Sequence, residues 1–493
     1  MSKFNLGFLK ANKTVNNEGA IAYSMSDKEK LVTQVLTSFF NENKFYGDNS
    51  QDILNTAKNV IKTEPSFVAN LCIFARKEMH LRTISHVLVS ELAKSTEGKE
   101  YVRRTLNKII ERPDDMTEVL AYYINTYGKP IPNSIKKGLA DSFGKFDEYQ
   151  LAKYNRKNAI KLKDILCLVH PKAKDEMQND LWKRLLEDRL ETPVTWETEL
   201  SAKGNTKETW ESLIDGNRLG YMAMMRNLRN IIKSGASNIN KVYEYLTDEE
   251  RVLKNKQLPF RYYSAYKVLK SEGIGTSKIY DALEIAIKTS TKNIDRLPGK
   301  TLIAADVSGS MTSHISAKSD LACAEVAVLM LSIANYICEE TITTTFDNNL
   351  YMCNLSTQNG IIANANSIEV NGGGTDITLP LRYLLDKKIF VDRIILLSDN
   401  EINIGYSNNM GYGGTKTSCQ ALVEEYKRRI NPNVWVHAID MQGYGTQQFK
   451  GRNVNIIAGW SERVFDFISS VEQGMDSLID KIGSYYFKQD QLL

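Results

Sequence analysis

Three oxygen-bearing side chains follow an apolar run in the segment Thr301-Leu-Ile-Ala-Ala-Asp306-Val-Ser308-Gly-Ser310-Met311. The run Leu302–Ala305 is short, apolar and bounded by turn residues, which is typical of a strand buried on both faces of a parallel sheet. The loop after it can aim the oxygens of Asp306, Ser308 and Ser310 at one point. One carboxylate with two hydroxyls suits a hard divalent ion such as Mg²⁺. The same residues could instead cap the next helix, and this stretch alone leaves both interpretations open.

Two further loops carry oxygen donors on the same side of the predicted sheet. The turn Asn371-Gly-Gly-Gly374-Thr375-Asp376 precedes a helix, and Leu396-Leu-Ser398-Asp399 ends an apolar strand in an acid. Ligands of open α/β sheets bind beyond the carboxyl ends of the strands, so these loops can converge on the first one. Asp376 is better explained as a helix cap. The expected metal ligands are Asp306, Ser308, Ser310, Thr375 and Asp399, with at least one open position.

A dense basic stretch occupies residues 129–172, with Tyr149, Tyr154 and His170 among its lysines and arginines. Lysine and arginine neutralise phosphates, and tyrosine rings stack on unpaired bases, so the stretch is a candidate RNA surface. The alternative is a solvated helix face with no ligand. The candidate RNA contacts here are Lys136, Lys137, Lys153, Arg156, Lys157, Lys161 and His170.

Two later segments place arginine beside aromatic residues. An apolar helical segment, 220–225, leads into Arg226-Asn-Leu-Arg229, and Pro259 starts a second helix that carries further arginine and tyrosine. Arginine for phosphate and tyrosine for stacking are what single-stranded nucleic acid requires. The alternative is that the aromatic and methionine side chains are core and the arginines cap carbonyls. The candidate RNA contacts here are Arg226, Arg229, Arg261, Tyr262 and Lys267, whereas Met224, Met225 and Tyr263 are better explained as core.

The elements that must position these residues form two parts. From Ser26 to Thr289 apolar residues recur at helical spacing with short polar joins, which predicts stacked helix pairs, among them one helix over Arg218–Ser234. From residue 301 onward strands alternate with helices, which predicts a doubly wound α/β domain. We expect the joint at Lys292–Lys300, and therefore domains over 1–295 and 296–493.

Composition narrows the class of protein. A chain of 493 residues with 42% hydrophobic and 25% charged residues predicts a soluble protein of more than one domain. No apolar run approaches the ~18 residues of a membrane span, and the N-terminus lacks the apolar core of a signal peptide, so we expect no membrane partner. The six scattered cysteines include no CxxC pair, which argues against zinc and a disulfide framework and for a cytoplasmic location.

Charge is distributed unevenly along the chain. From residue 301 onward, 14 Lys and Arg face 21 Asp and Glu, a net charge of −7, whereas residues 1–300 carry +11. A basic first part predicts contact with a polyanion. A basic surface without a partner is the alternative that charge alone leaves open.

Together these motifs resemble a known family. Asp306-x-Ser308-x-Ser310, Gly374-Thr375-Asp376 and Ser398-Asp399 are similar to the metal-ion-dependent adhesion site of von Willebrand factor A domains. The helical part, with Met225-Arg226-Asn227-Leu228 and Leu258-Pro-Phe-Arg261-Tyr-Tyr-Ser-Ala265-Tyr, resembles the TROVE module. The two cover nearly the whole chain, which resembles the Ro autoantigen family in its bacterial or phage branch.

The resemblance implies a fold, a metal site and RNA ligands that residue spacing alone does not predict. It implies an all-α ring of HEAT-like pairs followed by an A domain with a Mg²⁺ site at the five ligands named above. It implies binding of small noncoding Y-like RNA on a basic outer surface and of single-stranded RNA ends in the ring. A role in noncoding RNA quality control, maturation or decay follows, with an exoribonuclease or other protein as partner. We expect a monomer.

The rival hypothesis is a metal-dependent interaction scaffold, in which the A domain grips an acidic residue of a partner protein. An enzyme is the third option, and we expect none. No nucleophile–base pair is evident, because His314, the histidine nearest the metal loop, is expected to face solvent and Ser308 has no base. Metal-dependent nucleases commonly use two ions, whereas one is expected here.

Overall fold

The computed structural model describes residues 12–15, 21–24, 26–37, 48–155, 159–314, 321–399, 419–441, 449, 453–458 and 464–485. These fall into two compact units. The helical unit contains the described residues of Asp27–Leu36, Phe40–Gly204 and Met475–Leu493, and the mixed unit contains those of Met1–Ser26, Thr37–Phe39 and Asn205–Gly474. None of the described helices is both long and apolar enough to cross a membrane.

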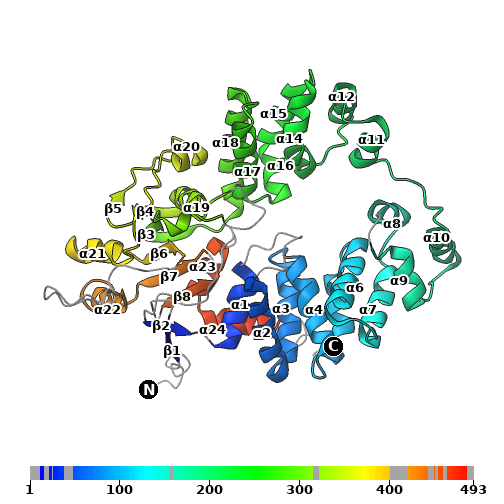
Figure 1. Ribbon diagram of the computed structural model, residues 1–493, viewed down its shortest axis with the longest axis horizontal. Helices are drawn as coiled ribbons and strands as arrows, with labels where there is room; N and C mark the ends of the chain where they lie inside the picture. Colours follow the sequence, from blue (N-terminus) through cyan, green and yellow to red (C-terminus); the bar gives the residue numbers. More distant parts are fainter. Residues whose placement is uncertain are drawn as a thin grey trace. The chain divides into compact units, whose positions relative to one another are not determined.

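The central helices of the helical unit, α3 to α7, form two layers, which Figure 1 shows in blue to cyan. α3, α5 and α7 pack side by side, and α4 and α6 form the second layer against them. This alternation is the packing expected of stacked helix pairs. The helices of the unit are α1 (Asp27–Thr37), α2 (Asp48–Thr63), α3 (Pro65–Lys77), α4 (Thr83–Lys94), α5 (Lys99–Ile109), α6 (Pro113–Tyr127), α7 (Asn133–Phe143), α8 (Glu148–Tyr154), α9 (Leu162–Val169), α10 (Glu176–Leu186), α11 (Trp196–Lys203) and α24 (Met475–Gly483).

Helix starts in this unit have local causes. Pro65 and Pro113 occupy the first turns of α3 and α6, where the missing N–H is not needed and the fixed φ suits a helix. Asp147 caps α8 by accepting a hydrogen bond from Gln150 N at 2.7 Å, and the Gln150 side chain returns to the Asp147 N–H. Asp175 caps α10 in the same way, through Gln178 N at 2.8 Å.

The C-terminal helix α24 belongs to the helical unit although it follows the α/β part in sequence. Asn70 of α3 donates to the Gly483 carbonyl at 2.8 Å, and the rings of Phe74 and Tyr485 meet edge to face with centroids 5.3 Å apart. Ile482 is fully buried in this contact region. No sequence pattern predicts this packing, because its partners lie about four hundred residues apart.

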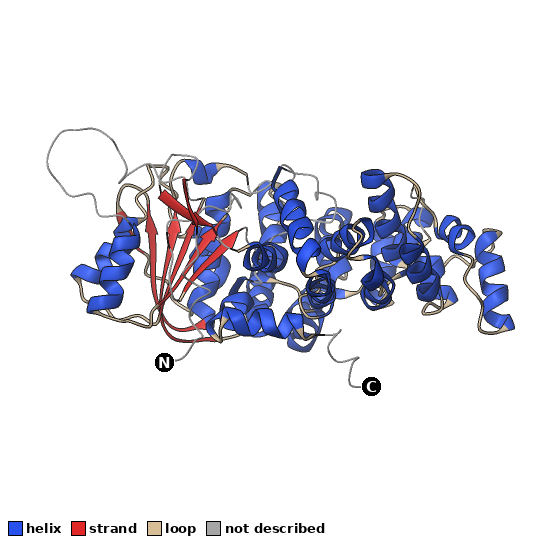
Figure 2. Cartoon of the chain, turned by 90° about the horizontal axis from the view of Figure 1, so that it is seen from below, coloured by secondary structure: helices blue, strands red, loops and turns tan. Residues whose placement is uncertain are grey.

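The mixed unit combines helices with a six-stranded sheet, drawn in red in Figure 2. The sheet order is β5-β4-β3-β6-β7-β8, with β5 antiparallel and the others parallel. Leu302, Ile394 and Val436 of three adjacent strands join one buried core with α21 and α22. The all-α plus doubly wound α/β fold class is thus confirmed. The strands and the helices that alternate with them are β3 (Leu297–Asp306), α19 (Cys323–Ile337), β4 (Cys338–Phe346), β5 (Leu350–Met352), α20 (Ile361–Asn366), α21 (Thr378–Asp386), β6 (Arg393–Ser398), α22 (Cys419–Arg429), β7 (Trp435–Asp440), β8 (Val454–Ala458) and α23 (Val464–Glu472).

The helices that precede the sheet fold in the same unit. They are α12 (Lys207–Asp215), α13 (Tyr221–Arg226), α14 (Leu228–Ser234), α15 (Ile239–Thr247), α16 (Glu249–Asn255), α17 (Pro259–Ser271) and α18 (Ser277–Ser290). The predicted single helix over Arg218–Ser234 is wrong, because the chain breaks at Asn227 between α13 and α14. An N-terminal hairpin of β1 (Asn12–Val15) and β2 (Ile21–Ser24) also belongs to this unit.

The expected joint at Lys292–Lys300 is partly strand. β3 begins at Leu297, and a register shift between Leu297 and Lys300 accommodates Pro298 and Gly299. Proline is tolerated near the start of a strand and at bulges, where no ladder hydrogen bond is lost. The predicted boundary between residues 295 and 296 stays a prediction.

Candidate functional site

The loop after β3 holds the first candidate metal ligands. Asp306 is the last residue of β3 and is fully buried, because β4 and β6 flank the strand on both sides. Its Oδ1 accepts from Ser308 N at 2.9 Å, and its Oδ2 accepts from Ser398 Oγ at 2.7 Å. The hydroxyls of Ser308 and Ser310 lie 3.2 Å apart. The carboxylate is therefore held in one orientation, and both hydroxyls of the motif gather beside it.

The glycine turn is bonded directly to this loop. Gly309 N donates to Gly373 O at 2.9 Å, and Gly372 N donates to Val307 O at 2.9 Å. Gly372 has a φ of +77°, which other residues adopt only with strain. A Cβ on Gly373 would lie 2.8 Å from Asp347 Oδ2, so no side chain fits there without movement. The close approach of the two loops places Thr375, which is buried, at the same edge of the sheet as Asp306.

Asp399 directly follows β6 and is buried beside the loop. β6 pairs with β3 so that Ala305 lies opposite Leu397, which sets Asp306 and Asp399 on neighbouring strand ends. Burial and, to a smaller extent, the negative charge of Asp399 raise the pKa of Asp306 to about 6, although hydrogen bonds from Ser308 and Ser398 oppose the rise. Two carboxylates sharing a buried edge are costly unless a cation lies between them.

The donor set fits the metal that the sequence predicts. All five predicted ligands offer oxygen, and oxygen donors suit Mg²⁺ rather than a soft metal. Asp306, Ser308, Thr375 and Asp399 are buried, whereas Ser310 is exposed. Asp376 instead accepts from Thr378 N at 3.0 Å at the start of α21, as a cap does.

Sequence reasoning missed two acids at the same edge. Asp347 directly follows β4 and is 4% exposed, with its carbonyl accepting from Asp376 N at 3.0 Å. Asp440 ends β7, is fully buried and lies opposite Ser398. Both carry the signal that pointed to Asp306, an acid at the end of an apolar or β-branched strand.

The described RNA candidates of the basic stretch lie on α7 and α8 and directly before and after α9 of the helical unit. Lys137 and His170 are exposed, and Lys136, Lys153 and Lys161 are half-buried. Within the described chain, Lys136, Lys137, Lys153 and His170 form no ion pair with a carboxylate. Arg156 and Lys157 lie outside the described residues.

The predicted RNA contacts of the mixed unit divide into exposed and engaged side chains. Arg226, Arg229 and Arg261 are exposed, and Arg229 pairs with Glu272 at 3.2 Å. Lys267 pairs with Glu325 at the start of α19 and so links α17 to the sheet domain.

The assignment of Tyr262 to RNA is wrong, because its side chain is fully buried. Tyr262, Tyr266 and Leu269 recur at helical spacing on the core face of α17, and the Tyr262 ring packs against Tyr221 at 6.3 Å. Arg261 lies on a different face of the same helix. Proximity in sequence alone had placed the arginine and the tyrosine on one surface.

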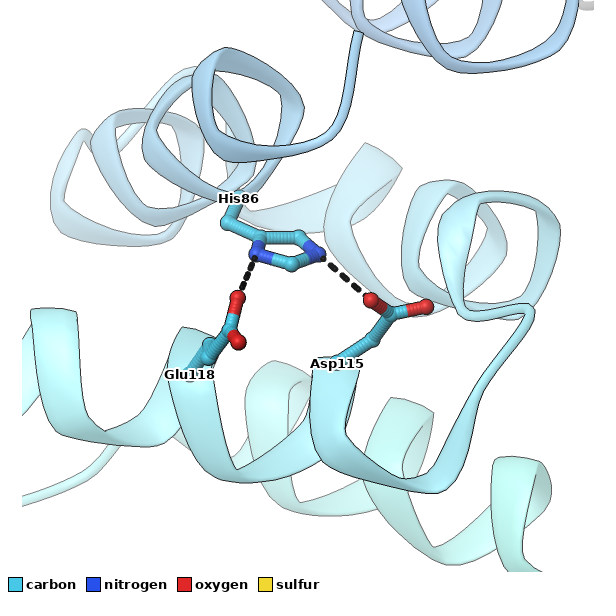
Figure 3. A group of neighbouring side chains, drawn as sticks. All are labelled: His86, Asp115 and Glu118. Carbon is cyan, nitrogen blue, oxygen red and sulfur yellow. Dashed lines mark ion pairs between the residues drawn. The ribbon is translucent and has the colours of Figure 1, made fainter. Parts of the chain in front are cut away.

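A buried charge cluster in the helical unit was also missed. His86 of α4 lies between two carboxylates of α6, with Nε2 3.3 Å from Asp115 Oδ1 and Nδ1 3.3 Å from Glu118 Oε2 (Figure 3). Asp115 also pairs with Arg82 at 2.5 Å and with Arg76 at 3.3 Å.

This cluster is better explained as a charge network than as a metal centre. The two carboxylates face different ring nitrogens, as Figure 3 shows, whereas a metal would use the lone pair of one nitrogen. Burial would lower the pKa of His86, but the neighbouring carboxylates of Asp115 and Glu118 outweigh burial and raise it. Burial would likewise raise the pKa of Asp115, yet His86 and the arginines hold it far below its usual range.

Comparison with known families matches both parts of the chain. The TROVE domain matches residues 20–188 and 183–278, together more than half of the chain. The Ro60 vWA domain matches residues 300–468.

Several curated proteins are similar to parts of the chain. Telomerase protein component 1 of Rattus norvegicus is 26% identical over 294 residues, covering 42% of this chain and 11% of that protein. RNA-binding protein RO60 of Caenorhabditis elegans is 28% identical over 211 residues, covering 40% and 32%. RNA-binding protein RO60 of Deinococcus radiodurans is 22% identical over 315 residues, covering 54% and 59%. The chain therefore matches less than two thirds of the length of each.

A solved structure shares the fold. The crystal structure of the Deinococcus radiodurans RO (RSR) protein matches with a TM-score of 0.66 at 17% identity, covering 91% of this chain and 100% of that one. The likeness extends over helices and sheet domain alike.

Proposed function

The chain belongs to the TROVE domain family and carries a Ro60 vWA domain after its helices, and on that premise we propose that it is an RNA-binding protein of the Ro type. This pairing of domains is the observation that carries the proposal. The resemblance to the Ro family drawn from the sequence motifs is confirmed by the same matches. Two relatives are themselves named RNA-binding proteins.

The basic residues on α7 and α8 and at the two ends of α9 form the proposed RNA surface. Lys136, Lys137 and Lys153 have no carboxylate partner in the described part of the helical unit, so their charge is available to phosphates. Electrostatic capture of this kind positions an RNA but does not read its sequence. We further propose small structured Y-like RNA and single-stranded RNA ends as ligands, in noncoding RNA quality control, maturation or decay.

RNA binding over a salt series tests this proposal. Anisotropy of a labelled RNA hairpin with a single-stranded tail should give an affinity that falls steeply with salt, with a slope of about −0.7 per neutralised phosphate for single strands. Reversing Lys136 and Lys137 to Glu should weaken binding and flatten the slope. The matched control reverses Lys387 and Lys388, two exposed lysines after α21, with the same change in net charge. Affinity independent of salt would contradict the proposal.

We also propose a Mg²⁺ site held by Asp306, Ser308, Ser310, Thr375 and Asp399. Bound Mg²⁺ would neutralise the two buried carboxylates and offer an open position to an incoming oxygen. Ser398 and the Ser308 amide hold the Asp306 carboxylate ready through the two hydrogen bonds that fix its orientation.

Metal-dependent stabilisation tests the site. A ligand that binds only the folded state raises the unfolding temperature with its concentration. Mg²⁺ or Mn²⁺ should therefore stabilise the wild-type protein, and Asp306→Asn should abolish the response. Asp376→Asn is the control, because Asp376 caps α21 rather than facing the loop. An equal response of both variants would remove Asp306 from the site.

The second candidate function is a metal-dependent interaction scaffold, favoured by the exposed position of Ser310 at the edge of an otherwise buried site. An exoribonuclease or other protein with an accessible acidic residue would be its partner. Charge reversal at Arg226 and Arg261 separates the two functions, since it should weaken RNA binding and leave partner capture intact.

We propose no catalytic activity of the chain itself. His314 is exposed, and the carboxylate beside Ser308, that of Asp306, is held by the Ser308 amide and the Ser398 hydroxyl as part of the proposed metal site. An RNA cleavage assay with metal, and with Asp306→Ala as control, tests this. We also propose a cytoplasmic location, which the free state of all six cysteines supports and which cell fractionation would test.

A further inference from the structure

One face of α8 carries an exposed aromatic ring next to unpaired positive charge. Tyr149 exposes 51% of its surface and is among the most exposed large hydrophobic side chains of the described chain. Lys153 lies one helical turn further along, with its Nζ 5.6 Å from the centre of the Tyr149 ring. The spacing of four residues is what brings the two side chains together on the helix surface.

The neighbouring tyrosine is engaged differently. Arg112 lies 4.7 Å from the centre of the Tyr154 ring, and Lys153 lies 5.8 Å from it. Tyr154 is only half-exposed, and two cations already contact its ring. Of the two tyrosines, Tyr149 is therefore the one whose ring face remains accessible to a ligand.

The charges around Tyr149 favour an anionic ligand. Glu148 is paired with Arg184, and Asp147 is occupied in capping α8 through Gln150 N. Lys153 forms no ion pair with any carboxylate in the described helical unit, and its contacts there are the two rings. Because the Lys153 ammonium contacts only aromatic rings, it can also bind the phosphate of a nucleotide whose base stacks on Tyr149.

We propose that Tyr149 and Lys153 form a stacking site for one unpaired nucleotide of a bound RNA. The base lies on the open face of the Tyr149 ring, and Lys153 contacts the adjoining phosphate. The site would accept any base, because every base has a stacking face and the ring offers no pattern of donors to read. The inference rests on the proposed RNA-binding function and assigns it a place for a single-stranded segment.

The test separates stacking from electrostatic attraction. Tyr149→Ala should weaken binding of a hairpin with a single-stranded tail by about five- to 150-fold, the usual loss for one stacked base, without changing the salt slope. Lys153→Met should reduce the salt slope by about 0.7, the contribution of one single-stranded phosphate. Tyr149→Trp should retain affinity, and a blunt hairpin should lose little in any variant.

A control variant and the pattern of binding separate failure of the stacking inference from failure of the proposed RNA-binding function. Tyr351→Ala removes a tyrosine that is 37% exposed on β5 of the mixed unit and should bind as the wild type does. If wild-type protein binds neither hairpin, the proposed RNA function fails and the stacking site with it. If wild-type protein binds the tailed hairpin and Tyr149→Ala binds it equally well, the stacking inference alone is overturned. If Tyr149→Ala unfolds at a lower temperature than the wild type, Tyr149→Trp becomes the deciding variant. Loss of RNA affinity in a folded Tyr149→Trp protein would overturn the stacking inference.

Discussion

Replacing Asp115 with Asn should destabilise the helical unit more than any change to a surface pair. Asp115 is fully buried and is the anion on which Arg76, Arg82 and His86 converge. It also accepts from Glu111 N and Arg112 N, both at 2.9 Å, at the start of α6. Asparagine keeps the size of the side chain but removes the charge that two buried arginines require.

The size of the effect follows from burial. The side chains of Arg76 and Arg82 are 8% exposed, so their charge cannot be transferred to water when Asp115 is neutralised. Removing one partner of a buried ion pair typically costs about 3–5 kcal/mol, and the lower end of that range applies here because Arg76 keeps Glu111 and Arg82 keeps Asp114 as partners. For a unit of this size that corresponds to a fall in unfolding temperature of the order of 10 °C.

Hydrogen exchange is the suitable assay, because the two units need not unfold together and a single melting temperature would then mix them. Amides of α4 and α6 should exchange about a hundredfold faster or more in Asp115→Asn, while strands β3 and β6 stay protected. The control is Asp141→Asn, which breaks the exposed bidentate pair with Arg103. Equal exchange in the two variants would refute the argument that burial makes the Asp115 network essential.

Three further outcomes are expected. The pKa of His86 is raised above its unfolded value near 6.5, so its stabilisation is complete below that pH and is lost as pH rises through the folded pKa; urea unfolding of His86→Gln should show a flatter pH profile. Gly373→Ala should reduce Mg²⁺-dependent thermal stabilisation, since its Cβ would lie 2.8 Å from Asp347 Oδ2, whereas Gly220→Ala, with open space around it, should not. A fragment over 296–474 should unfold at a lower temperature than one over 205–474, and equal melting would show that the helices before the sheet do not support it.

Local patterns predicted most of the elements in this chain. The predicted change from helices to alternating strands and helices is observed, because helices such as Leu162–Val169 have a clear apolar period and strands such as Arg393–Ser398 and Val454–Ala458 form short closed runs. The ends of β3 and β6 then follow, and with them the grouping of Asp306, Ser308 and Asp399. Strand ends are informative because parallel strands finish at one edge of a sheet.

The missed elements lack such a local signal. α11 buries none of its residues, so it has no apolar face for periodicity to reveal. The break at Asn227 separates two short helices that a continuous apolar pattern had merged. Tyr262 was misplaced for a related reason, since tyrosine suits both a core and a stacking surface, and only the packing of α17 against Tyr221 decides between them.

The contacts between α17, α18 and the sheet domain explain why some predicted RNA residues have another role. Asn366 of α20 donates to the Tyr266 hydroxyl at 3.0 Å, and Glu284 accepts from the amides of Ile362 and Ala363 at 3.1 Å. Lys267 joins the same set of contacts through Glu325. Charge counting along a sequence cannot distinguish a lysine in such a joint from a lysine that meets phosphate, because both add +1 to a basic half. The burial and the ion pairs of each side chain do distinguish them. Among the predicted RNA residues, those on α7 and α8 and at the ends of α9 carry the most positive charge without a carboxylate partner in the described chain.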